Sequence, residues 1–126
     1  VSTPTIDAVI LRESSGRPHV IAHNPKQDSL YGQARSNAYG LMQVRGIHAG
    51  TKACPEARSP TDLLNPAINL RCGVRLLAGF ISLFGLEQGL AAYHGGAGCI
   101  RKGLVICPAA TKYSEQVLFL LAQKLR

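Results

Sequence analysis

The chain has 126 residues and a net charge of +7, from 14 Lys and Arg against 7 Asp and Glu. This length suits one hydrophobic core, so we expect a single domain over residues 1–126. No uninterrupted apolar run reaches the length of about 18 residues that a membrane span needs. The basic residues are scattered singly, with no Lys/Arg cluster and no interleaved aromatic platform, which argues against nucleic acid as a partner and leaves an acidic polymer open.

The cysteines at positions 54, 72, 99 and 107 form no Cys-x-x-Cys pair, and no histidine has zinc-finger spacing. We therefore expect no metal site. An even number of cysteines in a small domain indicates disulfides made in an oxidising compartment. We favour Cys99–Cys107, which closes a short loop with glycine, and Cys54–Cys72, which ties a loop to a helix. Four reduced, buried thiols are the alternative.

The first predicted helix begins at Pro4 with Thr3 as its cap, because proline lacks only a donor that the first turn leaves unpaired. Aliphatic residues at positions 6, 9 and 10 share one face of this helix with Glu13, which lies in its last turn. Apolar surroundings and the negative end of a helix both disfavour a carboxylate, so we expect Glu13 to donate a proton near neutrality. The alternative is a solvated glutamate at a frayed helix end.

Turn residues end this helix, and residues 20–22 and 29–31 are predicted to pair as a two-stranded β patch. Ser59-Pro60 and Asn65-Pro66 predict a short helix over residues 61–64 and the main helix over residues 67–84. The main helix is apolar over most of its circumference and is expected at the centre of the fold. Further helices are predicted over residues 86–93 and 111–124, with a turn or two of helix over residues 97–103. The residues of the last helix that we expect to face inward are Tyr113, Val117, Leu120, Leu121 and Leu125.

Enzymes that cleave glycosides usually place two carboxylates around the bond, one as acid and one as nucleophile or base. Nothing in the pattern marks a partner for Glu13 among the other acids. Those acids are Asp7, Asp28, Glu56, Asp62, Glu87 and Glu115. The chain therefore offers one candidate acid for chemistry and no obvious second one.

Several motifs occur in order along the chain. They are Glu13-Ser14, Gly40-Leu41-Met42-Gln43, Asn65-Pro66-Ala67-Ile68-Asn69-Leu70 with Gly73, Ala92-Tyr93-His94-Gly95-Gly96-Ala97-Gly98, and Thr111-Lys112-Tyr113. Together they resemble the lytic transglycosylase catalytic domain of the soluble-lytic-transglycosylase (SLT) type, over nearly the whole chain. The resemblance implies a mainly α, lysozyme-like (goose-type) fold. It also implies cleavage of the MurNAc–GlcNAc β-1,4 bond of peptidoglycan without water, which leaves a 1,6-anhydro-MurNAc end.

The resemblance also implies roles for individual residues. Glu13 is expected to be the single acid and base, assisted by the N-acetyl group of MurNAc in place of a second carboxylate. Tyr93 is expected to steady that acetyl group or the Glu13 carboxyl. Met42 is expected as an apolar wall of the sugar groove and Gln43 as a hydrogen-bond donor in it, with Tyr113 nearby. Taken singly, a methionine, or a tyrosine at helical spacing, is more often a core residue.

The chain departs from the family pattern in three places. The family has a serine six residues before the motif glycine, where this chain has Ala34, and nearby Ser36 is a candidate to take over its contact with substrate. The family's Tyr-Asn is Tyr93-His94 here, so an amide is replaced by His94, a substrate-binding candidate that can titrate near neutrality. The stretch after the first motif is also longer than usual, which indicates an insertion within residues 19–33 that forms a groove wall or a surface flap.

We therefore predict a lytic transglycosylase without cofactor, a monomer that acts on peptidoglycan glycan strands in the periplasm or cell envelope. The positive charge suits an anionic wall polymer, and the cysteines suit an oxidising compartment. One alternative is a lysozyme-type muramidase that uses water. Another is a non-catalytic peptidoglycan-binding module of a secretion, conjugation or phage machine. The small size favours a specialised module of such a machine over a general recycler of the wall.

Overall fold

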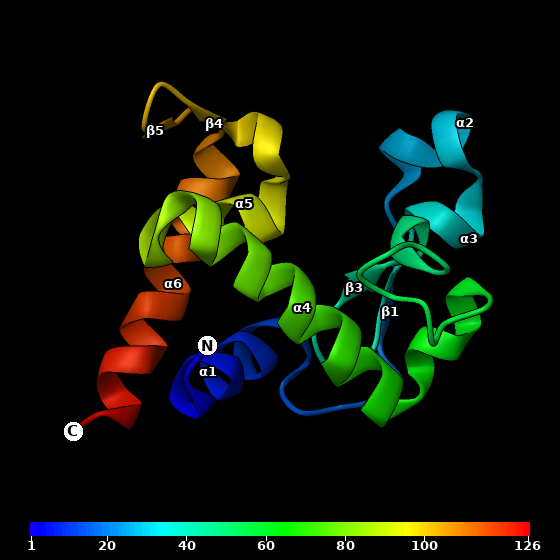
Figure 1. Cartoon of the computed structure of the whole chain (residues 1–126), viewed down its shortest axis with the longest axis horizontal. Helices are drawn as coiled ribbons and strands as arrows, with labels where there is room; N and C mark the ends of the chain where they lie inside the picture. The colour runs from blue at the N-terminus through cyan, green and yellow to red at the C-terminus, as the bar shows by residue number, and fades with distance from the viewer. The chain divides into compact units, whose positions relative to one another are not determined.

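The computed structural model describes residues 1–126, which form two compact units. Unit 1 comprises Val1–Arg12 and Leu76–Arg126, and unit 2 comprises Glu13–Arg75. The chain passes between the units inside two helices, α1 (Thr3–Ser14) and α4 (Pro66–Phe84), both labelled in Figure 1. Six α-helices and two small sheets make the protein mainly α, which confirms the predicted class.

Unit 2 contains a three-stranded antiparallel sheet in the order β1-β2-β3, of which Figure 1 labels β1 and β3. Strand β1 (Ile21–Ala22) pairs with β2 (Ala38–Tyr39), and β2 pairs with β3 (Val44–Arg45). Tyr39 lies opposite Ile21 on one side and Val44 on the other. The remaining elements that lie wholly in this unit are η1 (Pro25–Gln27), α2 (Asp28–Tyr31), α3 (Gln33–Ser36), η2 (Gly46–His48) and η3 (Pro60–Leu64).

The predicted β patch is half right. A strand forms at Ile21–Ala22 as expected, but its expected partner, residues 29–31, is wrong because this segment belongs to helix α2. Successive side chains of a strand point to opposite faces, so one of two neighbours is usually buried. Here the neighbours Leu30 and Tyr31 are both exposed, at 72% and 45%. Asp28 opens the helix, where a carboxylate suits the positive end of the helix dipole.

The two predicted cap-and-proline signals both start helices. Ser59 and Asp62 form a capping box at η3, in which the Asp62 carboxylate accepts the backbone N–H of Ser59 at 3.2 Å. The side-chain oxygen of Asn65 accepts the backbone N–H groups of Ala67 and Ile68 at 3.0 and 3.2 Å, at the start of α4. Local sequence chemistry therefore fixes where the longest helix begins.

Helix α4 is less buried than its apolar pattern predicts, and Leu83 near its end is 74% exposed. The residues of α4 that are buried are Asn69, Cys72, Gly73 and Leu77. By length and composition alone α4 could cross a membrane, but the core helix of a soluble protein passes the same test. The predicted Cys54–Cys72 disulfide is confirmed and ties α4 to the loop before η3.

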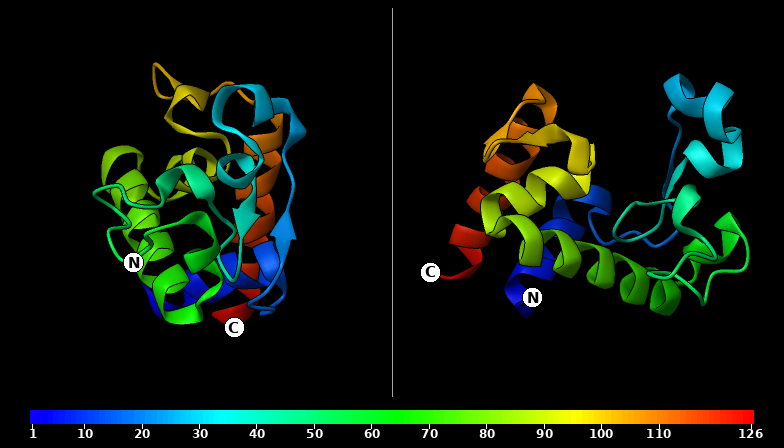
Figure 2. Two further views of the ribbon diagram at one scale, coloured as in Figure 1. Left: turned by 90° about the vertical axis from the view of Figure 1, so that its right-hand side faces the viewer. Right: turned by 45° about the horizontal axis from the view of Figure 1, so that its top comes forward.

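Unit 1 is built around α5 (Leu86–Gly95) and α6 (Pro108–Lys124), which pack against each other (Figures 1 and 2). A Cβ atom on Gly89 would lie 2.6 Å from the Cα atom of Ile81, so only glycine allows the start of α5 to approach the end of α4 this closely. The hydroxyl of Ser114 donates to the carbonyl oxygen of Glu87 at 2.7 Å and joins α6 to α5.

Between α5 and α6 the sequence predicted helical turns over residues 97–103, but only Ala97–Cys99 is helical and a β-hairpin follows it. After η4 (Ala97–Cys99), strands β4 (Ile100–Arg101) and β5 (Leu104–Val105) pair antiparallel. The two residues between the strands, Lys102 and Gly103, have φ angles of 53° and 74°, as a two-residue hairpin turn requires. The predicted Cys99–Cys107 disulfide is confirmed and closes this segment.

The two terminal helices differ from the prediction at their ends. Helix α1 begins at Thr3 and not at Pro4, and Ser2 caps it by accepting the backbone N–H of Thr5 at 3.3 Å. Helix α6 begins at Pro108, earlier than expected. Leu125, predicted to face inward, is 67% exposed because it lies just past the last helical turn.

Candidate active site

The candidate acid, Glu13, is a half-buried residue in the last turn of α1 and belongs to unit 2. The next residue, Ser14, is 2% exposed, and its hydroxyl donates to the carbonyl oxygen of Leu41 at 2.8 Å. The carbonyl oxygen of Ser14 accepts both the backbone N–H and the Nε–H of Arg17, each at 3.1 Å. The end of α1 is therefore attached to the Gly-Leu-Met-Gln segment, so the first two motifs of the sequence lie together.

The Gly-Leu-Met-Gln segment is held by Asn69, a fully buried residue of α4. The Asn69 amide donates to the carbonyl oxygens of Tyr39 and Leu63, both at 2.7 Å, and its side-chain oxygen accepts the backbone N–H of Met42 at 2.8 Å. These bonds satisfy a buried amide and three buried or partly buried backbone groups at once. Asn69 thus connects α4 to β2, to η3 and to the Gly-Leu-Met-Gln turn. Ser14 binds the same turn, next to Glu13.

Two glycines are required by this packing. Gly40 has a φ of 73°, and a Cβ atom on it would lie 2.6 Å from the Asn69 amide nitrogen. A Cβ atom on Gly73 would lie 2.5 Å from the sulfur of Met42. Met42 is fully buried against α4, so the structure places this predicted groove residue in the core of unit 2.

Gln43, the other predicted groove residue of this turn, has a positive φ of 50°. Its side-chain amide donates to the carbonyl oxygens of Val20 at 3.1 Å and Gly40 at 3.0 Å. Gln43 therefore braces the turn against the segment that leads into β1. Both of these donor bonds are made within unit 2.

Ser36, the candidate substitute for the missing serine, is fully buried at the end of α3. Its hydroxyl contacts the Asp28 carboxylate and the carbonyl oxygen of Gln33. The other oxygen of Asp28 pairs with His23 at 2.9 Å. The hydrogen bond from Ser36, and then that from His23, lower the pKa of Asp28 against the opposing effect of burial. The inserted segment is thus held together by a His23–Asp28–Ser36 network.

The other acids of unit 2 are engaged in local structure as well. The Glu56 carboxylate contacts the Arg75 guanidinium at 2.6 Å, and this hydrogen bond lowers the pKa of Glu56. The Asp62 carboxylate accepts the backbone N–H of Arg58 at 2.9 Å as well as the capping-box bond. Asp28, Glu56 and Asp62 therefore all have structural partners in unit 2, the unit that also contains Glu13.

Unit 1 contains the predicted Tyr93, His94 and Tyr113. Tyr93 and His94 are half-buried in the last turn of α5, and Tyr113 on α6 is 1% exposed. The His94 and Tyr113 rings are stacked, with their centroids 4.6 Å apart and their planes at 12°. The Arg12 guanidinium carbon lies 5.3 Å from the centre of the Tyr113 ring. Unit 1 thus brings His94 and Tyr113 together, and Arg12 lies over the tyrosine.

The structure contains no group of three or more His, Cys, Asp or Glu side chains that could hold a metal ion. Burial, and then the charge of Arg45, lower the pKa of His48, which keeps this partly buried histidine neutral at neutral pH. The chemistry available in unit 2 is therefore that of a half-buried carboxyl group at a helix end, beside a rigid turn.

Sequence reasoning missed two residues of this arrangement. Asn69 was recognised only as part of a motif, yet a polar residue between Ile68 and Leu70 in an apolar helix is a signal that its amide has buried partners. Arg12 donates through Nε to the side-chain oxygen of Gln116 at 2.7 Å, and these residues are so far apart in the sequence that no local pattern indicates the contact.

A comparison with protein families matches residues 1–114 to the family described as the transglycosylase SLT domain. This match covers most of the chain and bears out both the resemblance and the expected lysozyme-like class of fold. Among curated proteins, no sequence matches the chain significantly.

Proposed function

Because the chain belongs to the transglycosylase SLT family, whose domains act on peptidoglycan, we propose that it is a lytic transglycosylase with Glu13 as its acid and base. The observation that carries this proposal is the bond from Ser14 to Leu41, which anchors Glu13 beside the Gly-Leu-Met-Gln turn. The engagement of the other unit 2 acids supports a mechanism with one carboxyl group. In a mechanism with one carboxyl group, the substrate supplies the assistance that a second carboxylate would otherwise give.

In the proposed reaction, the Glu13 carboxyl donates its proton to the glycosidic oxygen as the bond from that oxygen to C1 of MurNAc breaks. The N-acetyl group of the same sugar stabilises the positive charge that develops at C1. The C6 hydroxyl oxygen then bonds to C1, and its proton passes to the Glu13 carboxylate. The products are a free hydroxyl on GlcNAc and a 1,6-anhydro-MurNAc end, and Glu13 is protonated again. No water is consumed.

The place of Glu13 in the fold supports this proton cycle. The reaction begins with a protonated carboxyl group and passes through its carboxylate form. A carboxyl group that loses and regains a proton in each turnover works best when neither form is strongly stabilised. Glu13 lies in the last turn of α1 and is half-buried, so it is partly shielded from water and still within reach of a ligand.

We propose supporting roles for the other predicted residues. Tyr93 steadies the acetyl group of MurNAc, and His94 contacts the sugar, held in place by its stacking on the buried Tyr113 ring. Met42 and Gln43 act mainly by shaping the turn beside Glu13, because Met42 is buried and the Gln43 amide braces the backbone. Ser36 stabilises the inserted segment through its hydrogen bond to Asp28. Because it is fully buried, it is the weakest candidate for contact with sugar.

Peptidoglycan as substrate implies that the protein works in the periplasm or cell envelope, in line with its two disulfides. We propose that it opens the wall locally, as a monomer and without cofactor. An enzyme should both bind isolated sacculi and cleave them, whereas a binding module should bind them without cleavage.

The test is digestion of purified sacculi by the wild type, by Glu13→Gln and by the control Asp7→Asn. Asp7 lies on the same helix and is exposed, so its loss changes the net charge equally without touching the proposed chemistry. We expect soluble anhydro-muropeptides from the wild type and Asp7→Asn, and none from Glu13→Gln. Reducing ends in place of anhydro ends would show a muramidase. Sacculus binding without turnover by any of the proteins would show a binding module.

A further inference from the structure

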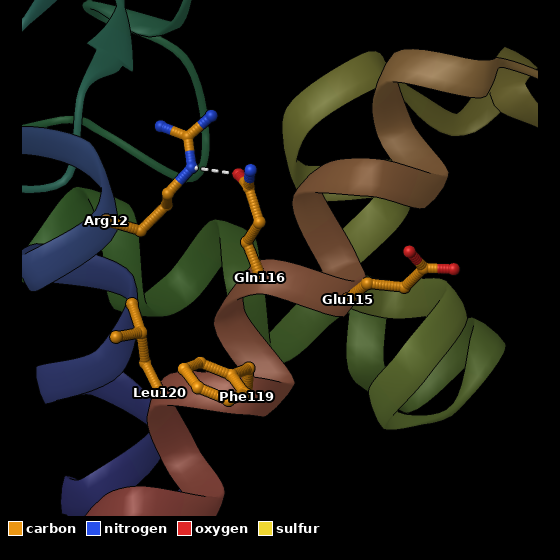
Figure 3. Close-up of a pocket in the computed structure, with 5 residues that line it drawn as sticks. All are labelled: Arg12, Glu115, Gln116, Phe119 and Leu120. Carbon is orange, nitrogen blue, oxygen red and sulfur yellow. Dashed lines mark hydrogen bonds between the residues drawn. The ribbon is translucent and has the colours of Figure 1, made fainter.

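A pocket of about 530 Å³ lies in unit 1 and is lined by one residue of α1 and four residues of α6 (Figure 3). The lining residues are Arg12, Glu115, Gln116, Phe119 and Leu120. None of the seven residues predicted for the active site lines this pocket. On α6 the residues stand in two rows at a spacing of four, with Phe119 one turn beyond Glu115 and Leu120 one turn beyond Gln116.

The Arg12 guanidinium in this pocket is held in one orientation. Its Nε–H donates to the Gln116 side-chain oxygen at 2.7 Å, and the group also lies over the Tyr113 ring. Figure 3 shows the two terminal nitrogens of Arg12 pointing away from Gln116. A guanidinium fixed through Nε presents its remaining N–H groups as a fork that fits a carboxylate, and less conformational entropy is lost when it binds.

The rest of the pocket is apolar, with a separate anion. Phe119 is 64% exposed and Leu120 is half-buried, so an apolar surface lies below the Arg12–Gln116 pair in Figure 3. Glu115 points away from Arg12 in the same view and does not neutralise it. The pocket therefore offers a cation, an apolar surface and an anion at separate places, which suits a ligand with both charges and small apolar groups.

We propose that this pocket binds the peptide stem of peptidoglycan, with Arg12 pairing with a stem carboxylate. The identity of the substrate rests on the proposed function. Peptide stems carry carboxylates, alanine methyl groups and the amine of a diamino acid, which match Arg12, Phe119 and Glu115 in turn. The acetylated glycan chain itself offers hydroxyl and acetamide groups, and its lactyl carboxyl is consumed in the amide bond to the stem. Charge complementarity therefore favours the peptide over the sugar.

The probe is the free tripeptide L-alanyl-γ-D-glutamyl-meso-diaminopimelate, titrated into the full chain and followed by calorimetry or backbone amide NMR. Triacetylchitotriose serves as a neutral glycan. We expect Arg12→Gln to weaken tripeptide binding about tenfold or more, since a charge-assisted pair is lost, and to leave triacetylchitotriose binding unchanged. Phe119→Ala should also weaken the tripeptide. Arg12→Lys should bind it with intermediate affinity, because it keeps the charge and loses the fork.

The matched control is Arg101→Gln, which removes an exposed cation from β4 of the same unit and should bind the tripeptide like the wild type. Unchanged tripeptide binding by both Arg12→Gln and Phe119→Ala would overturn the proposal. Equal losses for tripeptide and triacetylchitotriose would assign the pocket to sugar instead. Glu13→Gln keeps the two proposals separate, since it should bind the tripeptide normally while losing turnover. A wild type that binds tripeptide but never cleaves sacculi would contradict the proposed function alone.

Discussion

The buried amide of Asn69 gives the sharpest prediction about how the candidate site is held together. In Asn69→Leu the side chain keeps nearly the same volume, so no large cavity forms. The carbonyl oxygens of Tyr39 and Leu63 and the N–H of Met42 lose their partner. Each buried group left unpaired costs about 1–3 kcal/mol, and the added apolar burial offsets about 1–2 kcal/mol of the total. We therefore expect a net loss of about 1–8 kcal/mol, centred near 4–5 kcal/mol, a large part of the roughly 5–15 kcal/mol that stabilises a typical domain.

The measurement is urea unfolding of the wild type and Asn69→Leu, with Asn24→Ala as the control. Asn24 precedes η1 and its side chain makes no capping bond, so we expect its replacement to change the free energy of unfolding by less than about 0.5 kcal/mol. Activity on sacculi should fall with stability in Asn69→Leu, because the turn beside Glu13 loses its support. A loss below about 1 kcal/mol for Asn69→Leu would refute the hydrogen-bond reasoning.

Two further predictions concern the surroundings of the same turn. Gly73→Ala should lower the free energy of unfolding by about 1–3 kcal/mol because the new methyl meets Met42, whereas Gly79→Ala in the same helix should raise it by about 0.5–1 kcal/mol, since nothing lies within 4 Å of its Cβ position. Equal thermal shifts for the two variants would contradict this packing. Asp28 stabilises the folded state above its unfolded-state pKa, and this contribution is lost as the pH falls through its lowered folded pKa. Ser36→Ala removes the main cause of that lowering, so an NMR titration should show a higher pKa for Asp28, and an unchanged pKa would contradict the contact.

The starts of two helices and the disulfide pairing could be predicted from residues that are close together in the sequence. Ser59-Pro60 and Asn65-Pro66 each combine a cap with a residue suited to the first turn, and both helices begin there. The disulfide pairing followed in the same way from loop lengths and helix positions. By contrast, β1 pairs with β2 across the inserted segment, and strands of two residues carry too little alternation to identify a partner so far along the chain.

In the candidate site, too, some residues could be predicted from sequence motifs and others only from the structure. The motif order was enough to single out Glu13 and the Gly-Leu-Met-Gln turn, and Ser14 connects the two. The sequence did not predict that Met42 is buried, because a methionine suits a groove wall and a core equally well. The Arg12–Gln116 contact joins α1 to the last helix, so only the three-dimensional structure reveals it.

The central claim is that Glu13 drives bond cleavage without water. The most direct measurement is digestion of sacculi in water labelled with a heavy oxygen isotope, with the mass of the released MurNAc ends compared between wild type and Glu13→Gln. We predict unlabelled anhydro ends from the wild type, each lighter by one water than a reducing end, and no release by Glu13→Gln. Labelled reducing ends from the wild type, or unchanged release by Glu13→Gln, would contradict the account.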